Sequence, residues 1–275
     1  MLEEDPVVKA NIVEEGRLGD GPAFFRVGAG RPLVYLPGLT THHRPPRGMD
    51  RVFQVGQLRP FSRHREVWWV QRREGLAPGT TMTDIARDYA RALSDRFSGP
   101  VDVVGSSTGG TAALQLAADY PEAVRRLVLL SAACRLGPLG LSAERRLAEL
   151  LRNGDTRQAN AEMMSMLAAN EPTQWALAKL GWLVGPARRG EDLSDMLITI
   201  DAENAFDLTG ELPAITTRTL IVGGGRDRYY GEEVFRDTAS RLPNARLLYY
   251  PDKGHVATQS NRKTISEVFR FLDEP

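Results

Sequence analysis

Residues 101–118 read VDVVGSSTGGTAALQLAA, which joins an apolar run, a glycine-rich turn and a helical pattern. The valines of residues 101–104 predict a buried strand, and the alanines and leucines of residues 111–118 predict a helix. Gly105 and Gly109 flank the turn two residues to either side of Ser107, so that strand and helix can approach closely. A turn this sharp pushes one hydroxyl above the sheet, which makes Ser107 a candidate nucleophile.

The composition predicts a soluble, cytoplasmic globular protein. The chain has 275 residues, 42% of them hydrophobic, with 35 acidic and 35 basic side chains. This balance argues against a nucleic-acid-binding surface, because no basic excess is available to neutralise phosphates. The acidic start lacks the charged and apolar regions of a signal peptide, and no run approaches the roughly 18 apolar residues of a membrane span. Cys134 is the only cysteine, so we expect no intrachain disulfide.

Short apolar runs alternate with helical patterns in both halves of the chain, which is typical of a mostly parallel sheet covered by helices. The expected strands are residues 23–27, 32–37, 66–70, 101–104, 126–131, 219–222 and 246–250, and the expected helices of this layered part are 83–97, 111–120, 232–242 and 262–272. Thr81 and Asp84 have the spacing of a capping box at the start of the first of these helices.

Residues 136–206 interrupt this alternation. Strand signals disappear, and helical stretches follow at 142–152, 156–169, 173–183 and 192–206, separated by Gly, Pro and Asn. An all-helical insertion in an α/β chain indicates a cap over the ends of the strands. We therefore predict a core domain of residues 1–135 and 207–275, and a cap of residues 136–206.

The turn at Ser107 resembles the nucleophile elbow of the α/β-hydrolases. A serine hydroxyl needs a base to take its proton and a third group to orient that base, and in this fold the chain order is serine, acid, histidine. His255 is the only one of the four histidines beyond Ser107, and it follows a late strand. It is the predicted base. Asp227, which follows a glycine-rich turn after the strand 219–222, is the predicted acid.

Two other positions are alternatives for the acid. Some members of this architecture carry it after the strand that follows the elbow helix, but residues 131–138 read SAACRLGP and contain no carboxylate. Asp252 lies only three residues before His255, which is too local for the geometry. Both observations favour Asp227 over these alternatives.

Acyl transfer also requires backbone N–H donors directed at the developing oxyanion. The amide of Thr108, the residue after the nucleophile, is one predicted donor. The sequence LPGL at residues 36–39 directly follows a buried strand and makes the Leu39 amide the other. The alternative interpretation of Pro37-Gly38 is an ordinary turn.

Taken together, the motifs at residues 36–39, 105–110, 224–227 and 254–255 are similar in order and spacing to the α/β-hydrolase superfamily over essentially the whole chain. The resemblance implies a mostly parallel eight-stranded sheet with a helical cap. Many relatives have histidine where this chain has Pro37 and Ser106, and these departures obscure the subfamily without touching proton transfer. Haloalkane dehalogenases and epoxide hydrolases of this fold use an aspartate nucleophile, a role that Ser107 cannot take.

We expect neither a cofactor nor a metal. Gly28-Ala-Gly30 lacks the third glycine and the following helix of a dinucleotide site, and no phosphate-binding loop is present. No H-E-x-x-H motif or carboxylate cluster suggests a metal.

Substrate selection is assigned to the cap and to the loop after Leu39. Apolar cap residues are expected to line a pocket collectively, among them Met163, Met166, Trp175 and Trp182. Thr40 and His42 are candidate substrate contacts in the loop. The competing interpretations are packing within the cap and stabilisation of the loop.

The function predicted from these features is that of a serine hydrolase. Its expected substrate is a small carboxylic ester or lactone with an apolar portion. The same groups would serve thioester hydrolysis, C–C bond hydrolysis, acyl transfer or perhydrolysis, and a ligand receptor that has kept its triad is the non-enzymatic alternative. The sequence leaves a homodimer open.

Overall fold

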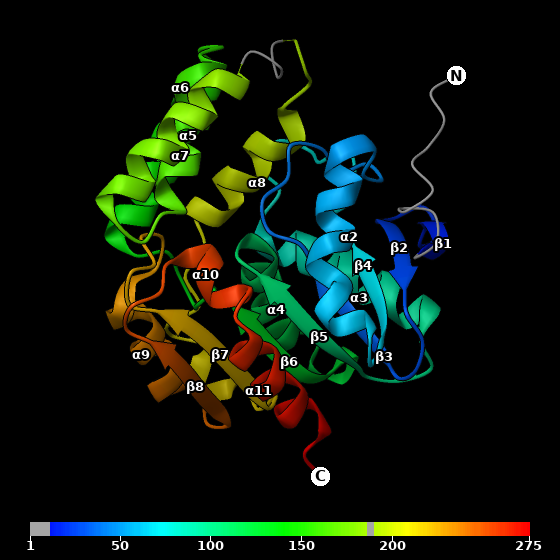
Figure 1. The fold of residues 1–275 in the computed structure, drawn as a ribbon. Coiled ribbons are helices and arrows are strands. Elements are labelled where there is room, and N and C mark those ends of the chain that lie inside the picture. The colour runs from blue at the N-terminus through cyan, green and yellow to red at the C-terminus, as the bar shows by residue number, and fades with distance from the viewer. Residues whose placement is uncertain (1–11, 186–189) are drawn as a thin grey trace.

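The computed structural model describes residues 12–185 and 190–275, which form an eight-stranded sheet with helices on both faces (Figure 1). The strands are β1 (Ile12–Arg17), β2 (Ala23–Val27), β3 (Pro32–Leu36), β4 (Glu66–Val70), β5 (Val101–Ser106), β6 (Val124–Leu130), β7 (Thr219–Gly224) and β8 (Ala245–Tyr250). Their order is β1-β2-β4-β3-β5-β6-β7-β8. Only the β1–β2 and β2–β4 pairs are antiparallel, so the predicted mostly parallel sheet is confirmed.

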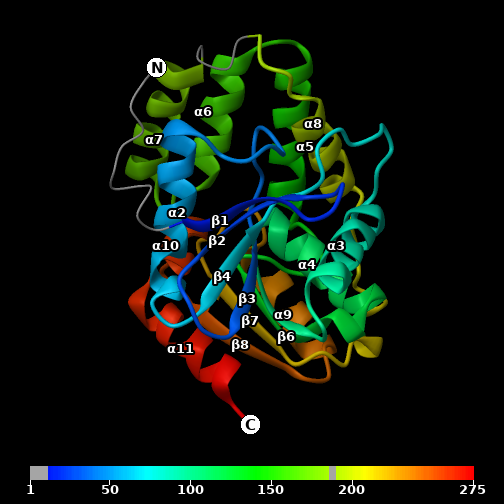
Figure 2. The same ribbon diagram turned by 90° about the vertical axis from the view of Figure 1, so that its right-hand side faces the viewer.

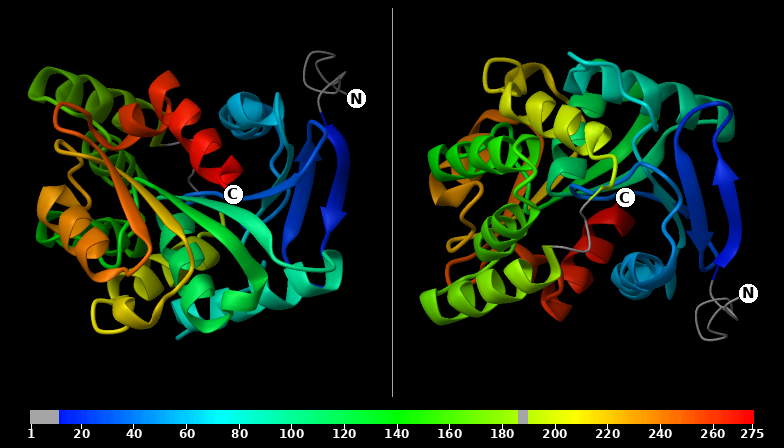
Figure 3. Two further views of the ribbon diagram at one scale, coloured as in Figure 1. Left: turned by 90° about the horizontal axis from the view of Figure 1, so that it is seen from below. Right: turned by 90° about the horizontal axis from the view of Figure 1, so that it is seen from above.

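Two apolar layers hold helices against the sheet. The helices of these layers are α2 (Gly48–Ser62), α3 (Met82–Arg96), α4 (Thr108–Asp119), α9 (Gly231–Arg241) and α11 (Arg262–Asp273). Helices α2 and α11 cover one face, and α3, α4 and α9 cover the other (Figure 3). β5 lies between the two layers and is buried along its whole length, which fits its run of valines.

A group of helices separates β6 from β7 in the chain. These are α5 (Pro138–Arg152), α6 (Thr156–Met166), α7 (Glu171–Val184) and α8 (Ser194–Asn204). They stand beyond the carboxyl ends of the central strands (Figures 1 and 2). Their bounds lie within a few residues of the expected helices, apart from an earlier start of α5 at Pro138. The division into a core and a cap at residues 136 and 206 stays a prediction.

Some elements were not expected from the sequence. β1 is a mostly exposed edge strand with the polar sequence IVEEGR, so it lacks an apolar pattern. Helix α2 begins at Gly48 and contains Pro60, residues that lower helix propensity; the burial of Leu58 and Phe61 against the sheet stabilises it instead. The expected capping box at the start of α3 is confirmed by reciprocal hydrogen bonds between Thr81 and Asp84.

None of the described helices is both long and apolar enough to cross a membrane. Within the same residues no group of three potential metal ligands comes together. Cys134 is buried. The acidic start of the chain lies outside the described residues.

Candidate active site

The turn at Ser107 has the backbone conformation of a tight strand-to-helix elbow. Ser107 has φ 51° and ψ −127°, in a region that L residues seldom adopt, and its amide donates to the Leu130 carbonyl at 2.9 Å. Glycines allow the strand β5 and the helix α4 to approach each other closely. A Cβ on Gly105 would lie 2.5 Å from the Gly109 carbonyl oxygen, and one on Gly110 would lie 2.3 Å from the Ala132 Cβ. The predicted sharp turn is therefore present at this serine.

A chain of hydrogen bonds joins the three predicted catalytic side chains. His255 Nε2 lies 3.0 Å from Ser107 Oγ, and His255 Nδ1 lies 2.8 Å from Asp227 Oδ2. Asp227 Oδ1 accepts from the Tyr229 amide at 3.0 Å. Asp227 and His255 are each 3% exposed. Because a carboxylate accepts from Nδ1–H, the lone pair of Nε2 faces the serine hydroxyl and is placed to take its proton.

The imidazole of His255 is held from several sides. His255 begins the short helix α10 (His255–Gln259), and its carbonyl accepts from Ser131 Oγ at 2.8 Å. The rings of Tyr229 and Tyr230 lie 5.0 and 6.2 Å from the imidazole between centroids. Sequence reasoning did not find these two tyrosines, although two aromatic residues directly after the Asp227 turn were the available signal.

The two predicted oxyanion donors come from the residue after the serine and from the loop that lies against it. Thr108 begins helix α4, where an N–H has no acceptor within its own helix. Leu39 follows Gly38, and a Cβ on Gly38 would lie 3.3 Å from Ser107 Cβ. Within residues 12–185 and 190–275, neither amide donates a hydrogen bond to a protein acceptor. Their assignment as an oxyanion hole remains a prediction that this arrangement supports.

The loop residues predicted to contact substrate have partners within the protein. Thr40 Oγ1 donates to the His42 carbonyl at 3.2 Å and accepts from Gln71 Nε2 at 2.9 Å. The His42 imidazole lies 3.6 Å from Glu191 Oε2 near the surface. These contacts favour the loop-stabilising interpretation for Thr40.

The structure separates the four cap residues predicted to line a pocket. Met166 is buried in the main core, and Met163 packs beside the apolar cluster of helices α5, α6 and α8. Trp175 and Trp182 are 63% and 46% exposed on α7, where Lys179 and Arg157 respectively lie over their rings. These two tryptophans face solvent, and their part in an apolar substrate pocket stays a prediction.

Two buried glutamates lie on helices α5 and α8, and one of them bonds to the elbow helix α4. Glu203 of α8 accepts from Thr111 Oγ1 at 2.9 Å, and Glu144 of α5 is buried near it. Burial raises the pKa of both carboxyls, and repulsion from Glu203 adds to the effect at Glu144. One oxygen of each has no partner among the described residues. Both glutamates lie on helices that were expected from the sequence, but nothing in the sequence indicated their burial.

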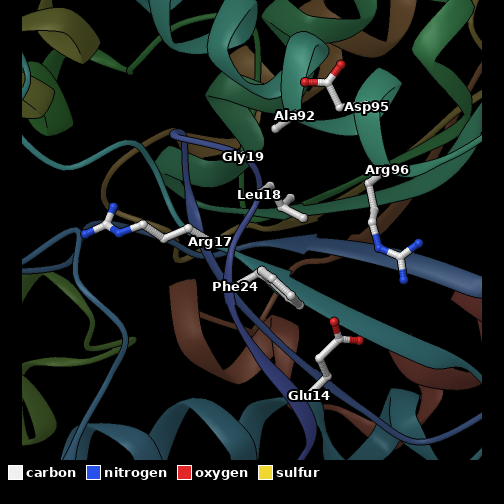
Figure 4. Close-up of a pocket in the computed structure, with 8 residues that line it drawn as sticks. All are labelled: Glu14, Arg17, Leu18, Gly19, Phe24, Ala92, Asp95 and Arg96. Carbon is white, nitrogen blue, oxygen red and sulfur yellow. The ribbon is translucent and has the colours of Figure 1, made fainter.

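A hollow of about 160 Å³ lies away from the candidate site, beside β2 and α3 (Figure 4). Phe24 and Leu18 form its apolar part, and Glu14, Asp95 and Arg96 line it with opposite charges. It contains none of the three predicted catalytic residues, so we assign it no role in the reaction.

His43 is a neutral side chain buried next to the loop after β3. It is 0% exposed, its Nδ1 lies 2.9 Å from the Arg73 carbonyl, and its Nε2 accepts from Arg72 Nε at 3.1 Å. The carbonyl requires a proton on Nδ1, which leaves the Nε2 lone pair for Arg72. Burial, with the nearby Arg72 charge, lowers the pKa of His43 to about 3 from an ordinary value of 6.5.

This buried histidine makes stability depend on pH. Between pH 6.5 and about 3 the unfolded chain binds a proton at His43 that the folded chain does not bind. The contribution of neutral His43 to the free energy of unfolding is therefore complete above pH 6.5 and is lost as the pH falls. From pH 7 to pH 5 we expect the free energy of unfolding to fall by about 2 kcal/mol more in the wild type than in His43→Gln. Urea titrations at both pH values measure this difference.

The exposed His64 provides the control for this prediction. His64→Gln should keep the pH dependence of the wild type. Equal pH dependence of the wild type and His43→Gln would show that His43 is not held neutral in the folded protein.

The sheet order and the strand-to-helix turn that carries Ser107 define the α/β-hydrolase class of fold. A family model described as "Alpha/beta hydrolase family" matches residues 33–268. The chain therefore belongs to the alpha/beta hydrolase family of enzymes.

Individual relatives are distant. The chain is 27% identical over 200 residues to a protein of Caulobacter vibrioides named putative carbamate hydrolase RutD, covering 72% of this chain and 74% of that protein. It is 28% identical over 211 residues to the pimeloyl-[acyl-carrier protein] methyl ester esterase of Neisseria meningitidis, covering 73% and 67%. The solved structure of MGS-M2, an alpha/beta hydrolase enzyme from a Medee basin deep-sea metagenome library, superposes with a TM-score of 0.78 at 19% identity, covering 95% and 98%. This last likeness concerns the fold alone.

Proposed function

We propose that this protein is a serine hydrolase that cleaves the acyl bond of a small, partly apolar carboxylic ester or lactone. The observation that carries the proposal is the continuous hydrogen-bonded chain from Ser107 Oγ through His255 to Asp227, with distances of 3.0 and 2.8 Å. The relatives named as esterase and carbamate hydrolase support acyl chemistry in general.

In the proposed reaction Ser107 Oγ attacks the substrate carbonyl while His255 Nε2 takes its proton. Asp227 accepts from Nδ1–H and stabilises the imidazolium that forms. The Leu39 and Thr108 amides bind the oxyanion of the tetrahedral intermediate. Its collapse gives the acyl-enzyme, with the proton passing from His255 to the leaving group. His255 then activates water, which releases the acid and restores the serine.

Covalent labelling tests the nucleophile. We expect a fluorophosphonate probe to label the folded wild type, because the probe needs an activated serine, and Ser107→Ala to abolish the label. Ester turnover in Ser107→Ala should fall by about 10⁴-fold or more. Ser106→Ala is the matched control: its hydroxyl donates to Gln259 Oε1 at 2.8 Å, and the variant should keep the label. A folded wild type without label would contradict the proposal and favour a non-catalytic ligand receptor.

A substrate panel tests the type of bond. p-Nitrophenyl esters, lactones, thioesters and carbamates of increasing chain length should show the highest kcat/KM for esters or lactones with a short apolar acyl chain. The highest value for thioesters or carbamates would contradict the ester assignment and leave the serine mechanism in place.

A further inference from the structure

Arg72 is a buried cation directly beside the candidate site. It follows β4, and only 1% of its surface is exposed. Within residues 12–185 and 190–275, its hydrogen-bond partners are carbonyls, a hydroxyl and an imidazole, and none is a carboxylate. Burial lowers the pKa of this guanidinium, although an arginine remains charged in proteins. The carboxyls of Glu203 and Asp195 oppose this effect of burial, but the hydrogen bonds of the guanidinium go elsewhere. Burying a charge costs stability, so the position of Arg72 calls for a role.

Most of the hydrogen bonds of Arg72 go to the loop that follows β3. Nη1 donates to the Pro37 carbonyl at 3.1 Å, and Nη2 donates to the Gly38 carbonyl at 2.8 Å and to Thr40 Oγ1 at 3.1 Å. Nε donates to His43, which is fixed in turn by the Arg73 carbonyl. The guanidinium therefore holds successive peptide groups of this loop in one orientation.

The Gly38 carbonyl and the Leu39 amide are the two ends of one peptide group. A donor on the carbonyl end polarises the N–H at the other end and makes it a stronger donor. The same bond fixes the plane of the peptide, which lies against Ser107 as the close approach of Gly38 demonstrates. The Arg72 charge thus acts on the amide that the proposed reaction needs.

We propose that Arg72 is a positioning residue of the oxyanion hole: it orients and polarises the Gly38–Leu39 peptide and places a fixed positive charge behind the developing oxyanion. This inference rests on the proposed function. A neutral substrate carbonyl gains little from that charge, whereas the tetrahedral oxyanion gains much from a charge fixed before the reaction begins. Arg72 therefore acts on kcat and leaves substrate binding nearly unchanged.

Kinetics of Arg72 variants test this role. On a p-nitrophenyl ester we expect Arg72→Lys to lower kcat by about 10- to 100-fold with KM changed by less than about twofold. Affinity for a trifluoromethyl ketone, which mimics the tetrahedral oxyanion, should fall by the same factor as kcat. Arg72→Ala should lower kcat further than Arg72→Lys, and added guanidinium should restore part of the activity of Arg72→Ala. Arg91→Lys, at an exposed position of α3, is the matched control and should behave as the wild type.

The chemical shift of the Leu39 amide proton tests the same role without an activity measurement. In the NMR spectrum of the folded protein, the Leu39 amide proton should move upfield in Arg72→Lys, because its peptide loses polarisation, and should stay unchanged in Arg91→Lys. An unchanged kcat in a folded Arg72→Lys, an increase in KM alone, or an unmoved Leu39 signal would overturn the inference. An inactive, unlabelled wild type would contradict the proposed function instead, and the Leu39 signal would still decide the role of Arg72.

Discussion

We expect Asp227→Asn to lower kcat for ester hydrolysis by about 10⁴-fold while the protein stays folded. Asp227 Oδ2 accepts from His255 Nδ1–H, and Oδ1 accepts from the Tyr229 amide. In the variant, the carboxamide oxygen keeps the bond to Tyr229 and its NH₂ group faces Nδ1. The imidazole then carries its proton on Nε2, which donates to Ser107 Oγ and cannot accept from it.

Asp252 supplies the control, because it is exposed and lies three residues before His255. Asp252→Asn should keep the wild-type kcat and fluorophosphonate labelling rate. Circular dichroism and thermal unfolding verify that both variants are folded. Full activity in Asp227→Asn, or a large loss in Asp252→Asn, would contradict the assignment of the acid.

The proposed triad could be predicted from the sequence because each member follows a strand at a recognisable turn. Glycines mark the turns at Ser107 and Asp227, and His255 was the only histidine downstream of the nucleophile. Parallel strands bring such turns to one edge of the sheet, so local signals were enough to bring together residues distant in sequence. Hydrogen bonds join all three side chains, which supports the proposed triad.

The surroundings of these residues could not be predicted in the same way. The bonds from Arg72 to Pro37 and Gly38 join segments more than thirty residues apart, and an arginine after a strand gives no sign of burial. Helix α2 was missed because its stability comes from burial of Leu58 and Phe61 rather than from propensity. The outward position of Trp175 was missed because the apolar pattern of a cap helix does not tell which partner covers it.

We expect Gly109→Ala to destabilise the protein by about 2–4 kcal/mol, because this glycine touches the backbone before the predicted oxyanion loop. A Cβ at Gly109 would lie 2.2 Å from the Leu36 carbonyl oxygen and 2.4 Å from that of Pro37. Neither oxygen belongs to a flexible side chain that could turn away. Helix α4 must then move away from β3, and the Thr108 and Leu39 amides separate. Urea unfolding measures the loss, and the fluorophosphonate labelling rate of the folded fraction should fall with it.

Gly56→Ala separates this steric effect from helix propensity. Gly56 lies in the middle of α2, and a Cβ there would meet nothing within 4 Å. Alanine should therefore stabilise the protein by about 0.5–1 kcal/mol at Gly56, and the same propensity gain applies inside α4. The steric destabilisation at Gly109 must exceed that gain before a net loss of stability is measured. Changes of opposite sign in the free energy of unfolding of the two variants would therefore assign the destabilisation to the contact with β3. A stabilising Gly109→Ala would instead show that α4 does not approach the end of β3 as closely as the elbow requires.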